Sequence, residues 1–395
     1  MLKKKRIALV NQRYGLEVNG GSEYYTRLIA ERLTKRYEVE VLTSKALSYE
    51  KWTNYYSEDI EIINGVTVRR FPTIRERNTT LMRLTGELIS RFRLNKKRLC
   101  DIWVKAQGPQ VPELVSYIQN HKEEYTAIIF VTYLYYPTVF GMPQAKDRAI
   151  FIPTAHDEPY IHFQSHAPLF TMPRSVIYLT EEEKRLVQTL YHNESIPSIV
   201  AGVGVDIPES VDNALFRKKY GIQGDYMIYT GRVDRNKGCH EMFEYFLKYL
   251  QETNSETSLI VMGQQFMDIP DDPGIRYLGY VSEEDKYNGV AGAKALWLPS
   301  PYESLSISVL EAMAMSVPVL VNGRCEVLKG HCMKSKGGMF YSDYKSCRSS
   351  LDTILHSSEY RDQLGHNAGE YIRMNYLWPQ ILDKIDSLIE EIDQE

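Results

Sequence analysis

Residues 298–321 read LPSPYESLSISVLEAMAMSVPVLV, and this stretch decides the fold class. An apolar strand ends at its start, two prolines break that strand, and another apolar strand follows the last proline. Between the strands, Leu310 and Met313 fall on one stripe of a predicted helix, and Ser304 or Ser306 is suited to cap it. A strand, a helix and a second strand in this order predict a parallel α/β sheet.

Two carboxylates frame this turn: Glu303 lies in the loop, and Glu311 lies inside the predicted helix. Ligands of open α/β folds bind at the carboxyl edge of the sheet, where strands turn into helices. The N–H groups at a helix start also favour a phosphate. The alternative is that both glutamates are ordinary solvated side chains.

Composition narrows the class of protein. The chain has 395 residues, enough for two or three domains, and its 43% hydrophobic and 25% charged residues are typical of a soluble globular protein. The net charge of −4 argues against nonspecific binding of nucleic acid. No apolar run approaches the roughly 18 residues of a membrane span, and residues 7–10 are too short for a signal-peptide core. The five cysteines form no C-x-x-C pair, so we expect a cytoplasmic protein without disulfides or a zinc site.

The N-terminal half opens with a strand–helix–strand pattern. Residues 7–10 are apolar, a polar loop carries Gly20 and Gly21, a helix is expected from about Glu23, and residues 39–42 form the next strand. The loop lacks the G-x-G-x-x-G fingerprint, but adjacent glycines let backbone N–H groups approach an anion. An ordinary flexible loop is the alternative.

A single histidine, His156, follows another predicted strand at residues 149–152. A histidine in such a place is often structural. Its position at the carboxyl end of a parallel strand makes a functional role equally reasonable.

Residues 69–105 differ in composition from the rest of the chain. They hold eleven lysines and arginines against three acids, interleaved with leucine, phenylalanine and other apolar residues. This pattern predicts a basic amphipathic helix pair that contacts an anionic membrane or an anionic acceptor. A solvated charged face over a packed stripe is the alternative.

The second half again alternates predicted strands and helices. A strand at residues 226–229 leads into a loop that carries Arg232 and Lys237 between glycines, and Gly263 follows the next strand. Arginine can grip a diphosphate with two parallel hydrogen bonds, and lysine adds a point charge. A solvated basic loop is the alternative. We place the domain boundary in the glycine-rich stretch at residues 199–206.

The motifs GR-x4-KG and PS-x-x-E-x7-E-A-M-A-x-x-x-P-V, in this order, resemble the retaining glycosyltransferases of family 4. Four more segments resemble family features: Gly20-Gly21 its first-loop motif, His156 its active-site histidine, residues 203–206 its linker, and residues 376–378 its crossover tail. The resemblance implies the α/β GT-B fold, with two facing Rossmann-like domains, parallel sheets and a C-terminal crossover helix. The domains would be residues 1–200, with 375–395 packing back on them, and residues 201–374.

The resemblance also implies the residue roles. The catalytic residues would be His156, Glu303, Arg232 and Lys237. The donor-binding residues would be Gly20, Gly21, Gly263, Tyr280, Leu305, Ser306 and Glu311. Glu311 would bind the ribose, Glu303 the donor sugar, and the two cations the diphosphate. The loop Ser304-Leu305-Ser306 departs from the family's glycine- and phenylalanine-rich loop, which leaves the donor sugar open.

The implied reaction moves a sugar, with retention, from a nucleoside diphosphate sugar such as a UDP-sugar to a saccharide or lipid-linked acceptor. We find no D-x-D pair for a divalent metal and expect no cofactor. The partners would be the donor, the acceptor and an anionic membrane contacted peripherally from the cytoplasmic side, without nucleic acid.

Two other classes remain open. One is a GT-B sugar-nucleotide epimerase, and the other is a noncatalytic module that binds nucleotide sugars. A pyridoxal-dependent phosphorylase would require a lysine Schiff base. A Rossmann dehydrogenase does not fit, because the glycine fingerprint is missing.

Overall fold

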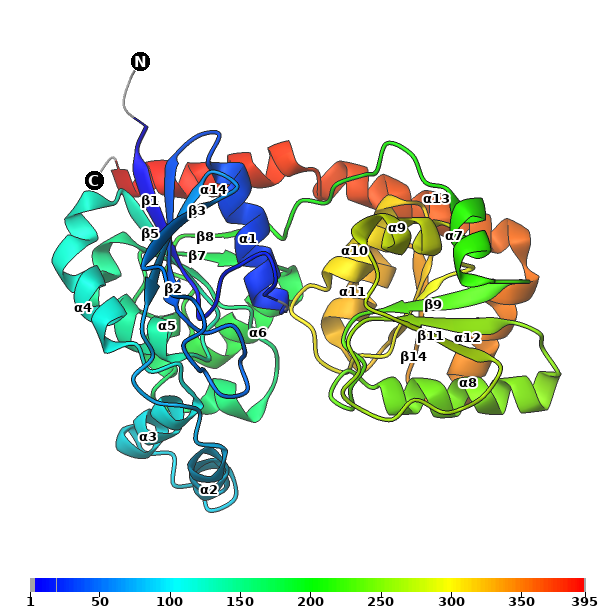
Figure 1. The fold of residues 1–395 in the computed structure, drawn as a ribbon, viewed down its shortest axis with the longest axis horizontal. Helices are drawn as coiled ribbons and strands as arrows, with labels where there is room; N and C mark the ends of the chain where they lie inside the picture. Colours follow the sequence, from blue (N-terminus) through cyan, green and yellow to red (C-terminus); the bar gives the residue numbers. More distant parts are fainter. Residues whose placement is uncertain (1–3, 19, 394–395) are drawn as a thin grey trace. The chain divides into compact units, whose positions relative to one another are not determined.

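The apolar runs of the sequence form the strands of two separate sheets in the computed structural model, which describes residues 4–18 and 20–393. The chain divides into two units (Figure 1). The first runs to Val203 and resumes at Ile381, and the second comprises Gly204–Gln380. These boundaries lie a few residues after the divisions at 200 and 374 that the sequence led us to expect.

The first unit is built on a sheet of eight strands among the described residues, in the order β3-β4-β2-β1-β5-β6-β7-β8. Every pair is parallel except β3 with β4. The chain moves outward in both directions from the central pair β1 and β5, which sets a topological switch point between them. The strands are β1 (Arg6–Val10), β2 (Glu38–Ser44), β3 (Ile60–Ile63), β4 (Val66–Phe71), β5 (Ala127–Val131), β6 (Ala149–Ile152), β7 (Ser175–Tyr178) and β8 (Ser198–Val200).

Amphipathic helices cover this sheet. Leu114 and Ile118 of α4 belong to the same buried core as Ala8 of β1 and Phe130 of β5. Figure 1 shows α2 and α3 together at the lower edge of the unit, and Trp103 of α3 belongs to the same buried core as the sheet. The helices are α1 (Gly21–Leu33), α2 (Thr79–Ser90), α3 (Lys97–Gln107), α4 (Pro112–His121), α5 (Tyr136–Gly141), α6 (Glu181–Tyr191) and the 3-10 helices η1 (Lys122–Glu124), η2 (Met142–Gln144), η3 (Lys146–Arg148), η4 (Pro159–His162) and η5 (Ala167–Phe170).

The last helix, α14 (Trp378–Asp393), belongs to the first unit from Ile381 onward. Its apolar side chains are buried there, and Arg36 forms ion pairs with Asp383, at 2.8 Å, and with Asp386. The sequence therefore returns to the first unit after the second is complete.

The second unit is built on a fully parallel sheet of six strands among the described residues, in the order β11-β10-β9-β12-β13-β14. The strand order reverses between β9 and β12, which are neighbours. The strands are β9 (Tyr226–Thr230), β10 (Ser258–Met262), β11 (Ile275–Gly279), β12 (Leu296–Leu298), β13 (Val319–Asn322) and β14 (Gly338–Tyr341).

Helices connect successive strands of this sheet, except β10 and β11, which are joined by a loop. The helices are α7 (Asn213–Tyr220), α8 (Cys239–Thr253), α9 (Glu283–Ala291), α10 (Ile307–Ala314), α11 (Glu326–Ser335), α12 (Tyr344–His356) and α13 (Ser358–Asn375). No helix of the described ranges combines the length and the apolar character needed to cross a bilayer.

Candidate active site

The switch point of the second unit brings two candidate loops together. Residues 231–238 follow β9, and residues 299–306 follow β12, its neighbour in the sheet. In parallel sheets both loops emerge at the carboxyl edge, where ligands bind. This edge holds the polar residues that the sequence singled out in both motifs.

An ion pair joins the two loops: Lys237 Nζ lies 2.5 Å from Glu303 Oε1. Both side chains are partly shielded from water. The loops predicted to hold the diphosphate and the sugar therefore carry opposite charges that neutralise each other.

Asp234 organises the first loop and was not predicted as a site residue. It is buried; one carboxylate oxygen accepts the backbone N–H of Lys237 at 2.8 Å, and the other pairs with Arg232 Nε. This aspartate thus contacts the side chain of Arg232 and the backbone of Lys237. Its signal in the sequence was an acid between two cations in a glycine-flanked loop.

Two glycines allow the backbone to approach closely at this edge. Gly263 has φ 132°, and a Cβ there would collide with the carbonyl oxygen of Gly231. Gly238 has φ 74°, and a Cβ there would collide with the carbonyl oxygen of Pro299. Both positions favour glycine on conformational grounds and because there is no room for a side chain.

Ser306 starts α10 in a way that the sequence did not predict. It occupies the N-cap position, but its side chain makes no capping hydrogen bond, and its φ of 74° is uncommon for a residue other than glycine. The sequence offered Ser304 or Ser306 as the cap: Ser306 holds that position, but its hydroxyl makes no capping hydrogen bond and lies 3.3 Å from the hydroxyl of Ser308.

The neighbouring residue Leu305 is buried, and its carbonyl oxygen lies 3.1 Å from Nε2 of His331, a fully buried residue of α11. His331 carried no signal in the sequence. It fixes the backbone of the loop just before α10 begins.

Glu311 of α10 is almost completely buried. Its Oε1 accepts hydrogen bonds from Lys286 Nζ at 2.9 Å and from the Tyr287 hydroxyl at 3.3 Å, both from α9. Burial raises the pKa of the Glu311 carboxyl above its usual value, and the ammonium of Lys286 opposes that shift. Lys286 was missed because its sequence neighbourhood is that of an ordinary exposed helix.

Tyr280 lies just after β11 and is 75% exposed. Gly279 before it has a left-handed φ of 70°. The tyrosine ring is therefore available at the same edge of the sheet, two strands away from β9.

In the first unit, His156 lies in the loop after β6, as expected for a residue at the carboxyl edge of the sheet. Its Nε2 lies 3.4 Å from Oε2 of Glu158. The N–H of Ala155, the preceding residue, donates to Glu183 of α6 at 2.5 Å. Neither glutamate was predicted as a site residue.

Gly20 and Gly21 lie at the start of α1, which begins at Gly21, two residues before the expected start at about Glu23. A Cβ on Gly20 would collide with the carboxylate of Glu23, whereas one on Gly21 would meet open space. Glu23 is itself buried and paired with Arg13 at 2.5 Å. The anion nearest to this helix start is therefore the protein's own carboxylate. Asn19 of the predicted loop lies outside the described residues.

The basic stretch 69–105 contains α2 and α3, but it is less uniform than predicted. Arg69 and Arg70 belong to β4 and are paired with Glu40, at 2.7 Å, and with Glu61, at 2.5 Å. They do not contribute to a free basic surface, because strand pairing turns them into the fold. The remaining exposed cations lie on or beside α2 and α3.

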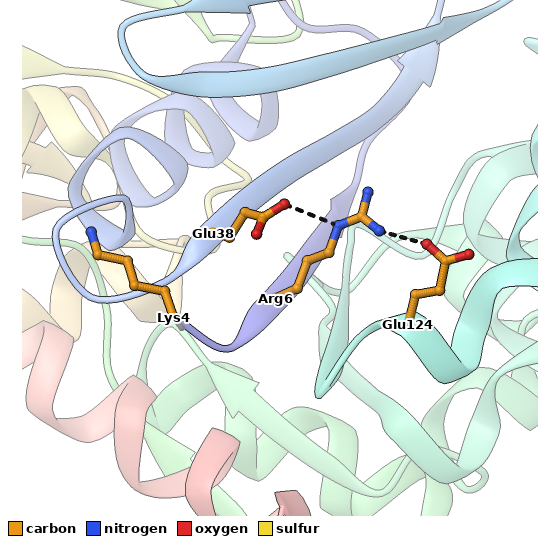
Figure 2. Close-up of a pocket in the computed structure, with 4 residues that line it drawn as sticks. All are labelled: Lys4, Arg6, Glu38 and Glu124. Atoms are coloured by element: carbon orange, nitrogen blue, oxygen red, sulfur yellow. Dashed lines mark hydrogen bonds and ion pairs between the residues drawn. The ribbon is translucent and has the colours of Figure 1, made fainter. Parts of the chain in front are cut away.

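Figure 2 shows a pocket at the opposite, amino end of the first sheet, lined by Lys4, Arg6, Glu38 and Glu124. Arg6 lies 3.5 Å from Glu38 and 2.6 Å from Glu124, and Lys4 donates to the carbonyl oxygen of Thr34. Its charges compensate one another, so we assign it a structural role. Across the described ranges, no group of three or more His, Cys, Asp or Glu side chains is arranged to hold a metal ion.

Comparisons with known proteins agree with this architecture. Residues 212–371 match the family model of glycosyl transferases group 1. The chain is 24% identical to an uncharacterized glycosyltransferase of Methanocaldococcus jannaschii, with 95% of each chain covered. It is 21% identical to the O-antigen chain mannosyltransferase B of Escherichia coli, over 72% of this chain and 77% of that protein.

Solved structures share the fold. Anabaena HepE in complex with UDP and glucose superposes with a TM-score of 0.71 at 14% identity, covering 98% of this chain and all of that one. Sucrose-phosphate synthase of Thermosynechococcus elongatus gives a TM-score of 0.70 at 16% identity, covering 98% and 99%. The chain therefore has the two-domain α/β GT-B fold expected from its sequence, and its residues 212–371 match the glycosyl transferases group 1 family.

Proposed function

We propose that the protein transfers a sugar from a nucleoside diphosphate sugar, with UDP as the nucleotide, to a saccharide or lipid-linked acceptor. The observation that carries this proposal is the Lys237–Glu303 ion pair beside Arg232, at the switch point of the second sheet. Two adjacent loops thus carry Arg232 and Lys237, which we propose for the diphosphate, and Glu303, which we propose for the sugar. The relatives named glycosyltransferases support the reaction class.

The departing diphosphate sets the chemical requirement. Negative charge builds on its oxygens as the bond to the sugar carbon C1 breaks. In our proposal Arg232 and Lys237 stabilise this charge, with the N–H groups at the start of α10, in place of a metal ion. Lys237 would turn from Glu303 to the phosphate, which would leave Glu303 to accept hydrogen bonds from the sugar.

Retention of configuration follows if the acceptor oxygen attacks C1 from the side on which the diphosphate leaves. A bond from C1 to the acceptor oxygen replaces the bond from C1 to the phosphate oxygen, and the departing phosphate takes up the acceptor proton. His156 would bind the sugar and stabilise its positive charge. Gly20, Gly21, Gly263, Tyr280, Leu305 and Ser306 would shape the donor site, and Glu311 would hold the ribose.

We also propose that the acceptor is met at an anionic membrane, through a surface that we call the α2–α3 surface. Its apolar members on α2, Leu81, Leu84 and Leu88, are spaced along one face and are exposed, Leu84 at 48%. Phe92, just beyond the helix, is 62% exposed. A helix normally buries such a stripe, so an exposed one marks a contact site.

The charges on this surface favour a lipid bilayer. Arg83, Arg91 and Arg93 lie beside the apolar stripe and are exposed, and Lys96, Lys97 and Arg98 follow at the start of α3. Apolar residues flanked by cations are the pattern of helices that lie in the interface of anionic lipids.

The proposal is tested with a panel of nucleotide sugars, by measuring release of nucleoside diphosphate with and without saccharide acceptors. Acceptor-dependent release, with retention seen in the proton NMR spectrum of the product, is the expected result. Conversion of the donor without an acceptor would indicate the epimerase. Tight binding of a nucleotide sugar without turnover would indicate a binding module.

A further inference from the structure

The loop that carries His156 is held from two sides by glutamates. Glu183 is completely buried and accepts the N–H groups of Ala155, at 2.5 Å, and Leu179, at 2.6 Å. It fixes the backbone immediately before the histidine. Glu158, two residues after the histidine, instead faces the imidazole itself, with 3.4 Å between its Oε2 and Nε2 of His156.

The second oxygen of Glu158 is also engaged. Oε1 accepts a hydrogen bond from the hydroxyl of Tyr133, a completely buried residue from the loop after β5. Burial alone would raise the pKa of Glu158, but the contacts with His156 and Tyr133 bring it below its usual value. The carboxylate is thus anchored at one oxygen and presents the other, as an anion, to the histidine.

A purely local role does not account for this placement. Glu158 occupies the N-cap of the short helix η4, but its side chain makes no capping hydrogen bond. Anchoring the loop to Tyr133 would require only one carboxylate oxygen. The second oxygen is directed at the one side chain of this loop that the sequence marks as functional.

We propose that Glu158 is a positioning residue for His156. Its carboxylate orients the imidazole and favours the ring form that carries a proton on Nε2, as an acceptor beside one ring nitrogen does in general. Only the expected effect of Glu158 on turnover rests on the proposed function. The contact itself belongs to the first unit alone.

The test compares three variants by the ring nitrogen shifts of His156 in 15N NMR, with the signal assigned by His156→Asn. Glu158→Met keeps the length of the side chain but removes the acceptor, whereas Glu158→Gln keeps an acceptor oxygen. Asp157→Asn is the matched control, because it removes a carboxylate charge from the adjacent side chain, which is 77% exposed.

In the unmodified protein, in Glu158→Gln and in Asp157→Asn, we expect the 15N shifts of His156 to show a proton on Nε2. In Glu158→Met we expect this pattern of shifts to be lost. In the same variant kcat should fall on the order of tenfold to a hundredfold with KM little changed, by analogy with partners that orient a metal-bound imidazole. Glu158→Gln should restore most of the rate.

Unchanged His156 shifts in Glu158→Met would overturn the assignment, even if that variant were less stable. Altered shifts with full activity, together with a fully active His156→Ala, would instead remove His156 from the proposed reaction and leave the positioning contact intact. The two failures are therefore distinguishable.

Discussion

The ammonium of Lys237 lies 2.5 Å from the carboxylate of Glu303, so the β9–α8 loop and the β12–α10 loop are joined by their own charges. A bound diphosphate would compete with Glu303 for this ammonium. In our proposal the pair would therefore link binding of the diphosphate to release of the Glu303 carboxylate.

Replacing either cation by alanine should cost about 2–4 kcal/mol of transition-state stabilisation, the loss typical of one preorganised donor. Arg232→Ala and Lys237→Ala should thus lower kcat by roughly two to three orders of magnitude. Steady-state rates measure this. Lys294→Ala is a matched control, because Lys294 forms a 3.1 Å ion pair with Asp225 at the opposite edge of the same sheet. Near-normal turnover in both site variants would exclude these cations from the site.

Replacing Glu303 and replacing Glu311 should have different effects. Glu311→Ala should weaken binding of the bare nucleoside diphosphate, because the proposed partner of Glu311 is the ribose. Glu303→Ala should leave that binding nearly intact and lower turnover of the intact donor, because its proposed partner is the sugar. Calorimetric titration beside steady-state rates separates the two, and the reverse pattern would contradict our assignment of roles.

Activity should persist in EDTA. In our proposal the diphosphate charge is met by Arg232, Lys237 and the start of α10, so no divalent ion is needed. The measurement is turnover after extensive chelation, with and without added Mg²⁺ or Mn²⁺. A complete loss that either metal restores would show that the assignment of the cations is wrong.

Much of the proposed donor site follows from the sequence, because its parts are local. The strands β12 and β13 and the helix α10 lie where the apolar pattern of residues 298–321 predicts them. The left-handed turn at Ser306 was not predictable from a hydroxyl residue, which more often caps a helix with its side chain.

Partners brought in from other elements were also missed. The contact of Lys286 with Glu311 and that of Glu183 with Ala155 each join different elements of a unit, and no local pattern marks them. The prediction of a basic surface was wrong for Arg69 and Arg70. A count of charges does not distinguish a strand residue with an ion-pair partner from an exposed one.

The α2–α3 surface should bind anionic vesicles at low salt. Each basic residue near such a surface contributes about 1 kcal/mol, and salt screens the attraction. Flotation with phosphatidylglycerol vesicles should recover the protein, and the double variant Leu84→Gln/Phe92→Gln should reduce recovery. Leu215→Gln, at another exposed leucine near lysines, is the control. Equal recovery with neutral vesicles at low salt would indicate a merely solvated face.

Stability should depend on pH through Glu183. Burial raises the pKa of its carboxyl from 4.5 to about 8, so between these values the folded chain holds a proton that the unfolded chain has released. The contribution of this group to stability is therefore complete below about pH 4.5 and is lost as the pH rises through about 8.

Accordingly, the midpoint of thermal unfolding should fall less steeply between pH 5 and pH 8 in Glu183→Gln than in the unmodified protein. Glu181→Gln, at an exposed position of the same helix turn, should follow the unmodified protein. Identical slopes in all three proteins would show that Glu183 does not titrate in this range.

Because Ile381 and the residues after it belong to the first unit, the second unit is an insertion within the first, bounded by two covalent connections. Residues 204–380 form one continuous segment of the chain. The first unit is discontinuous in sequence, and a fragment that stops at Val203 lacks the partners of Arg36 and the apolar face of α14. A protease that cuts only one connection leaves the two units tethered by the other, so separating them requires two cuts.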